Sequence, residues 1–219
     1  MADQPSSTPL RIGIILFPGF QALDAFGPLD CLNDLSRTHN LTLSILSSTL
    51  SPVSTKVPLL PNTISQSILP THTFATAPDL DVLLIPGGLG IRDSGPAIQD
   101  AISYIRAVYP KLQYLITVCN GSALAAIAGV LDGRRATTNK KIFDEVAALG
   151  PKVDWVPQAR WVVDGNIWTS SGVSAGIDVI LAWIEEVFGE KVADDLTNGL
   201  EYTRHRDANI DPFAKVHGL

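Results

Sequence analysis

The chain has 219 residues, of which 46% are hydrophobic and 17% are charged, and its formal net charge is −6. This composition excludes a disordered chain, and the acidic balance argues against a nucleic-acid-binding surface. The chain carries two cysteines, shows no signal-peptide pattern at its N-terminus and contains no apolar run long enough to span a bilayer. We therefore expect a cytoplasmic protein that binds neither nucleic acid nor a membrane.

Strands and helices are predicted to alternate along the chain. Residues 1–10 are rich in Ser and Pro and are expected to form a flexible tail, and residues 11–219 a single α/β domain. Short apolar runs predict strands at residues 11–17, 41–46, 81–86 and 112–118, and a hairpin over residues 161–169. Helical spacing predicts helices near residues 24–36, 96–109, 141–149, 173–187 and 190–197. This order predicts an α/β sandwich with a mostly parallel sheet.

Proline and polar residues set the expected ends of these helices. Pro28 is tolerated in a first turn, which places the start of the first helix between residues 24 and 27. Asp93 or Ser94 is expected to cap the next helix. The chain from Tyr202 onward is polar and is expected to be irregular.

Cys119 lies where a predicted strand meets a predicted helix. Asn120-Gly121-Ser122 has turn and cap chemistry, and an alanine-rich helical run follows it. The N-terminus of that helix is expected to favour nearby negative charge and to lower the pKa of the thiol. The arrangement predicts a nucleophile elbow with sulfur as the nucleophile. The alternative is a structural cysteine, because free cysteines are among the most buried residues.

A crevice is expected at the carboxyl ends of the strands, near a topological switch of the sheet. If the strands at residues 11–17, 81–86 and 112–118 are neighbours, this crevice holds Asp24, Gly87, Gly88 and Cys119. The N–H groups of Gly88 and Asn120 could form an oxyanion hole there. Asp24 buried beside a thiolate would have a raised pKa and could donate a proton at neutral pH, whereas an N-cap is its alternative role.

A second candidate nucleophile is Ser174. It lies in Gly172-Val173-Ser174-Ala175-Gly176, which matches the serine-hydrolase elbow, and the residues downstream that could complete a triad are Asp194, Asp195, His205 and His217. Such short matches of small residues are frequent by chance, so we favour a helix cap at this position. The four histidines show no metal-ligand spacing. The Lys140-Lys141 pair is interpreted as a solvated helix end.

Taken together, these segments resemble the ThiJ/PfpI superfamily, and most of all its isocyanide hydratase branch. The resemblance covers nearly the whole chain after residue 10. The segments that carry it are Leu16-Phe17-Pro18, Leu23-Asp24, Gly27-Pro28, Ile85-Pro86-Gly87-Gly88, Val118-Cys119-Asn120-Gly121-Ser122, Gly133-Arg134-Arg135-Ala136-Thr137-Thr138, Val163-Asp164-Gly165-Asn166, Gly172-Val173-Ser174-Ala175-Gly176-Ile177-Asp178 and Leu200-Glu201-Tyr202. The resemblance implies a flavodoxin-like three-layer α/β sandwich of the class I glutamine amidotransferase-like type.

The same resemblance implies roles for particular residues. Cys119 matches the reactive cysteine and Asp24 its acidic partner, while Gly88 and Asn120, with Gly87 beside them, match the backbone donors that face the cysteine. A homodimer is implied, and no metal or organic cofactor is required. The chain departs from the pattern in two places. Asn120 stands where hydratases carry Thr, and Asn139-Lys140 replaces a His-Trp pair.

These residues lead to three functional hypotheses. The first is an enzyme that hydrates a small electrophile, an isocyanide, to an N-substituted formamide through a thioimidate on Cys119, with Asp24 as general acid and base. The second is glutathione-independent, glyoxalase-type conversion of a 2-oxoaldehyde, in which His205 could come near the site. The third is a non-enzymatic thiol that senses oxidation and becomes a sulfinic acid stabilised by Asp24.

Overall fold

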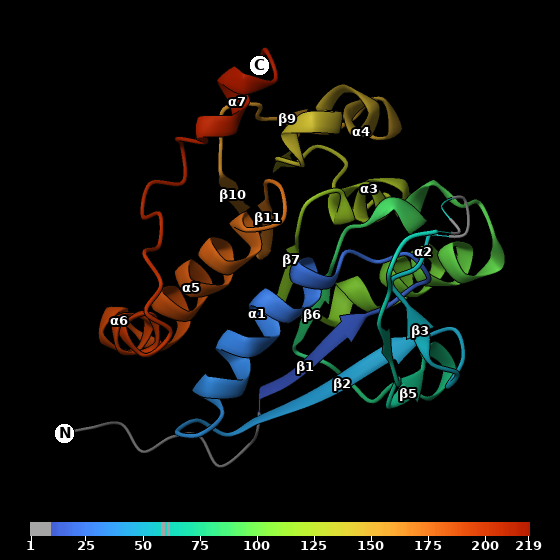
Figure 1. Ribbon diagram of the computed structural model, residues 1–219, viewed down its shortest axis with the longest axis horizontal. Helices are drawn as coiled ribbons and strands as arrows, with labels where there is room; N and C mark the ends of the chain where they lie inside the picture. Colours follow the sequence, from blue (N-terminus) through green and yellow to red (C-terminus); the bar gives the residue numbers. More distant parts are fainter. Residues whose placement is uncertain (1–9, 58–59, 61) are drawn as a thin grey trace.

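A seven-stranded sheet forms the centre of the computed structural model, which describes residues 10–57, 60 and 62–219. The strand order is β10-β11-β7-β6-β1-β2-β5 (Figure 1). All neighbouring strands are parallel except the β10–β11 hairpin. The strands are β1 (Leu10–Ile15), β2 (Leu41–Ser47), β5 (His72–Thr73), β6 (Val82–Ile85), β7 (Tyr114–Thr117), β10 (Trp161–Asp164) and β11 (Ile167–Ser170).

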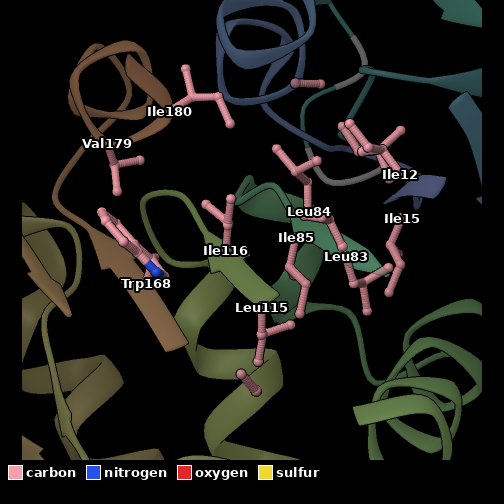
Figure 2. Close-up of a cluster of buried hydrophobic side chains, with 14 of the residues drawn as sticks. Ile12, Ile15, Leu83, Leu84, Ile85, Leu115, Ile116, Trp168, Val179 and Ile180 are labelled. Atoms are coloured by element: carbon pink, nitrogen blue, oxygen red, sulfur yellow. The ribbon is translucent and has the colours of Figure 1, made fainter. Parts of the chain in front are cut away.

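Helices cover both faces of this sheet, which confirms the predicted flavodoxin-like sandwich. One face carries α1 (Ala22–Leu35), α5 (Ala175–Phe188) and α6 (Glu190–Gly199), and the other carries α2 (Pro96–Val108) and α3 (Gly121–Ile127), with α4 (Phe143–Leu149) beside α3. Because side chains alternate along a strand, neighbouring residues of β7 supply both cores. Figure 2 shows Ile116 on the side of Val179 and Ile180 of α5, and Leu115 pointing to the opposite side.

The central strands are buried on both faces, as continuous apolar runs predict. All four residues of β6 are buried. The helical spacing of Ile98, Ile102, Ile105 and Tyr109 predicts α2, in which the three isoleucines are buried together with Ala101, while Tyr109 lies in the turn after the helix and is half-buried. The remaining elements are short. They are β3 (Val53–Ser54) with β4 (Ser67–Ile68), β8 (Arg135–Ala136) with β9 (Asp154–Trp155), α7 (Pro212–Val216), and the 3-10 turns η1 (Phe74–Thr76), η2 (Leu89–Arg92), η3 (Tyr109–Lys111) and η4 (Lys140–Ile142).

Helix ends differ from the sequence predictions in two places. Helix α1 begins at Ala22, so Pro28 lies inside it and not in its first turn. Pro28 has no main-chain N–H to donate, so α1 lacks one helical hydrogen bond at this position. Helix α2 is preceded by Gly95 as N-cap, while Asp93 accepts a hydrogen bond from the Gly95 N–H at 3.0 Å.

Three further expectations concern the chain ends and a lysine. The flexible tail predicted for residues 1–10 lies, up to residue 9, outside the described residues, and Leu10 already belongs to β1. The irregular C-terminal segment contains α7, which is capped by the Asp211 carboxylate. The sequence predicts the Lys140-Lys141 pair in solvent, and Lys141 is exposed, whereas Lys140 is only 4% exposed. Among the described helices, none has the length and apolarity needed to cross a bilayer.

Candidate active site

The three strands expected to frame the site are neighbours. Strand β6 lies between β7 and β1, and the sheet grows in one direction from β1 to β2 and in the other from β6 to β7. The boundary between β1 and β6 is therefore a topological switch, where ligands bind in open α/β sheets. Asp24 follows β1, Gly87–Gly88 follows β6 and Cys119 follows β7.

Cys119 occupies a strained turn between β7 and α3. Its φ is +58°, in the left-handed region that a residue with a side chain seldom adopts. The main chain there is fixed from two sides, because the Cys119 N–H donates to the Ser171 carbonyl at 3.0 Å and the Cys119 carbonyl accepts from the hydroxyls of Thr138 (3.1 Å) and Ser122 (3.3 Å). This conformation is that of a nucleophile elbow.

Cys119 is 6% exposed, and N–H donors lie around its sulfur. The Asn139 side-chain amide donates to Sγ at 3.0 Å, and the main-chain N–H groups of Val173 and Asn120 also point to the sulfur. Burial nevertheless raises the thiol pKa to about 12, and the neighbouring negative charge of Asp24 raises it further, while the three donors oppose the rise. The predicted lowering by the helix N-terminus is therefore wrong, because desolvation outweighs it in this site.

Asp24 is buried in the first turn of α1, with 1% of its surface exposed. Its Oδ2 accepts the Gly87 N–H at 3.0 Å, and among the described residues Oδ1 has no hydrogen-bond partner. Burial raises the pKa of the carboxyl to about 7, and the Gly87 N–H and the adjacent Cys119 thiol oppose this rise. Near neutral pH the carboxyl can therefore either hold or accept a proton beside the sulfur. An N-cap role is excluded, since Gln21 is the N-cap.

The main chain of Gly88 and the side chain of Asn120 form two reciprocal hydrogen bonds. The Gly88 N–H donates to Asn120 Oδ1 at 2.8 Å, and Asn120 Nδ2 donates back to the Gly88 carbonyl at 3.1 Å. The two N–H groups expected to form an oxyanion hole thus have partners within the protein, since the Gly88 N–H is engaged by the Asn120 side chain and the Asn120 main-chain N–H faces the sulfur. Gly87 is required by space, since a methyl group there would collide with the Asn120 amide and lie 2.8 Å from Asp24 Oδ2.

The motif around Ser174 encloses the cysteine from the other side. Gly172 lies against the Asn139 amide, and Val173 turns its N–H to the sulfur at a φ of +41°. Ser174 is the N-cap residue of α5, but its hydroxyl makes no cap hydrogen bond and contacts the Arg160 guanidinium at 3.4 Å. The short sequence match thus belongs to the wall of the Cys119 site.

Sequence reasoning missed Asn139, Thr138 and Val173 as site residues. Asn139 was visible only as a departure from the family pattern, and Val173 only as part of the serine motif. His205 is exposed, and its main-chain N–H donates to Asp178 at 2.9 Å. Within the described residues no three His, Cys, Asp or Glu side chains are grouped to hold a metal ion.

Fold and site together define a flavodoxin-like α/β protein with a cysteine at a strand-to-helix elbow. The chain belongs to the DJ-1/PfpI family, whose sequence profile matches residues 10–186. It is 36% identical over 196 residues to the isonitrile hydratase of Pseudomonas putida, an alignment that covers 88% of this chain and 78% of that protein. A deglycase of Pyrococcus horikoshii is 34% identical over 108 residues, covering 49% of this chain and 60% of the deglycase.

A solved structure shows the same architecture. The crystal structure of a ThiJ/PfpI family protein from Pseudomonas syringae superposes with a TM-score of 0.75 at 27% sequence identity. The superposition covers 94% of this chain and 80% of the other. The family resemblance inferred from the sequence is confirmed.

Proposed function

We propose that this protein hydrates an isonitrile to an N-substituted formamide, with Cys119 as nucleophile and Asp24 as general acid and base. The observation that carries the proposal is the pairing of a thiol at a strained elbow with a buried carboxyl whose pKa is raised to about 7. The identity of 36% to an isonitrile hydratase along most of the chain supports this choice of substrate.

The first half of the reaction forms a carbon–sulfur bond. The thiol proton of Cys119 passes to the Asp24 carboxylate, and the resulting thiolate attacks the terminal carbon of the isonitrile. Negative charge develops on that carbon, which then takes the proton back from Asp24. The product is a thioimidate in which the former isonitrile carbon carries one hydrogen and is bonded to sulfur, and Asp24 is again a carboxylate.

The second half of the reaction releases the formamide. Asp24 takes a proton from a water molecule while the water oxygen adds to the thioimidate carbon, and the nitrogen takes the proton from Asp24. The hydroxyl of the tetrahedral intermediate then loses its proton to Asp24, the carbon–sulfur bond breaks and the Cys119 thiolate leaves. Proton transfer from Asp24 restores the thiol. One isonitrile and one water give one formamide, so the scheme needs no cofactor.

The test compares wild type, Cys119→Ala and Cys31→Ala with an aryl isonitrile. Cys31 is the second cysteine, 1% exposed on α1, and serves as the matched control for loss of a buried thiol. We expect formamide from wild type and Cys31→Ala and none from Cys119→Ala. Turnover by Cys119→Ala at the wild-type rate would contradict the scheme.

The pH dependence gives a second test. When both the Asp24 carboxyl and the Cys119 thiol are protonated, the site has no base, so kcat/KM should rise with pH through about 7. Above this pH kcat/KM should level off, because the Cys119 thiol keeps its proton until about pH 12. Asp24→Asn should remove this rise together with most of the activity. A kcat/KM that falls as pH rises through 7 would contradict the assigned role of Asp24.

A second candidate function is the conversion of 2-oxoaldehydes, and it is favoured by the similarity to a deglycase. Parallel assays with methylglyoxal and an aryl isonitrile separate the two candidates. Oxidation sensing is less well supported, because the buried Cys119 thiol lacks the exposure and thiolate character of sensor cysteines.

We also propose the homodimer implied by the family, to be tested by light scattering coupled to size-exclusion chromatography.

A further inference from the structure

The side chain of Asn139 has a fixed orientation toward the reactive sulfur. Its Nδ2 lies 3.0 Å from Cys119 Sγ, and its Oδ1 accepts the Lys141 N–H at 2.9 Å. A main-chain N–H is only a donor, so the amide oxygen must face Lys141. The amide nitrogen must then face the sulfur, and the donor role of Asn139 follows from the hydrogen-bond network itself.

The segment that carries Asn139 is held on both sides. The Thr138 hydroxyl donates to the Cys119 carbonyl at 3.1 Å, and the buried ammonium of Lys140 donates to the Thr137 hydroxyl at 2.6 Å. Gly172 supplies the space for the amide, because a methyl group at that position would lie 2.7 Å from Asn139 Nδ2. The donor is therefore preorganised before any substrate binds.

We propose that Asn139 is a catalytic residue, which holds the negative charge of Cys119 Sγ when the thiol proton moves to Asp24 and again when the thiolate leaves the product. A hydrogen bond to a charged acceptor is roughly twice as strong as one to a neutral acceptor. Asn139 therefore stabilises the thiolate more than the thiol. A carboxamide neither gains nor loses a proton, so Asp24 keeps the acid and base roles. The assignment rests on the proposed function and adds a residue to it.

Asn139 has a second, structural role that the experiment must separate from this one. Its oxygen caps the η4 turn through Lys141, and capping by Asn, Asp and Ser is comparable. Asn139→Ser and Asn139→Asp therefore keep an oxygen for the cap and lose the N–H donor to sulfur. Gly172→Ala displaces the amide without changing the cap residue. All variants are made in the Cys31→Ala background, which leaves Cys119 as the single thiol.

The readout is the rate at which iodoacetamide alkylates Cys119 at about pH 8, measured by mass spectrometry next to kcat for formamide formation. Loss of a hydrogen bond to a charged group should slow alkylation about tenfold or more in Asn139→Ser. Asn139→Asp should be slower still, because its carboxylate repels the thiolate, and Gly172→Ala should change the rate in the same direction. Alkylation at the parent rate in Asn139→Ser and Asn139→Asp would overturn the proposal and leave only the cap.

The alkylation rate does not depend on isonitrile turnover, so the two proposals can fail separately. Slow alkylation in the variants, together with a parent protein that leaves isonitriles unchanged, would overturn the proposed function and keep Asn139 as the sulfur's donor. Normal alkylation in the variants of an active hydratase would overturn only the role of Asn139.

Discussion

Replacement of Asp24 by Asn should stabilise the protein, and the gain should grow with pH. Burial raises the pKa of Asp24 from 3.8 to about 7, so between these values the folded chain holds a proton that the unfolded chain has released. Stability therefore falls as pH rises through this window. A tenfold change in proton affinity corresponds to about 1.4 kcal/mol, so the loss reaches at most about 4 kcal/mol above pH 7. Asn avoids this loss and still offers an oxygen to the Gly87 N–H.

Urea unfolding of wild type and Asp24→Asn at about pH 4 and about pH 8 measures this effect. The advantage of the variant in free energy of unfolding should increase by about 4 kcal/mol between the two pH values. Asp30→Asn, which removes an exposed carboxyl from the same helix, controls for the change in net charge. A difference that stays constant with pH, or a variant less stable than wild type at about pH 8, would refute the reasoning.

Three other substitutions test the surroundings of the site. Gly87→Ala should lower kcat/KM at least tenfold and destabilise the fold by about 1–3 kcal/mol, because its methyl group would crowd Asp24. The control is Gly199→Ala, whose methyl group would meet a neighbouring atom only at 3.8 Å. The control should change neither kcat/KM nor the melting temperature by a comparable amount. Ser174→Ala should retain wild-type turnover, and loss of activity there would revive the serine hydrolase hypothesis. Burial lowers the pKa of Lys140 from 10.5 to about 8, so between these pH values the unfolded chain binds a proton that the folded chain does not. In urea titrations, the free energy of unfolding of wild type should therefore rise by about 3 kcal/mol relative to Lys140→Met as pH increases from 8 to 10.5. A constant difference between the two proteins would contradict this.

The features that sequence predicted well depend on local patterns. Apolar runs and turn residues predicted the central strands and the corner at Cys119, because a parallel strand buried on both faces has a continuous apolar sequence. The prediction that Asp24, Gly87 and Cys119 lie close together required one further assumption, that the strands preceding them are neighbours in the sheet. Strand order β7-β6-β1 confirms that assumption.

The features that sequence missed depend on contacts between distant segments. Asn139 reaches Cys119 from a loop 20 positions away, and Val173 approaches from the turn before α5. The thiol pKa follows mainly from burial, which no local pattern reports. The same holds for Lys140, whose burial depends on partners supplied by Ala159 and Thr137, and for the Gly88 N–H, which the Asn120 side chain occupies.

The central claim is that Cys119 Sγ bonds to the substrate carbon. Wild type mixed with excess aryl isonitrile, quenched in acid during turnover and digested, tests this by mass spectrometry. Addition of a thiol to an isonitrile loses no atoms, so the peptide containing Cys119 should gain the full mass of the isonitrile, and the peptide containing Cys31 should gain none. Continued formamide production with Cys119 unmodified at every quench time would contradict the account.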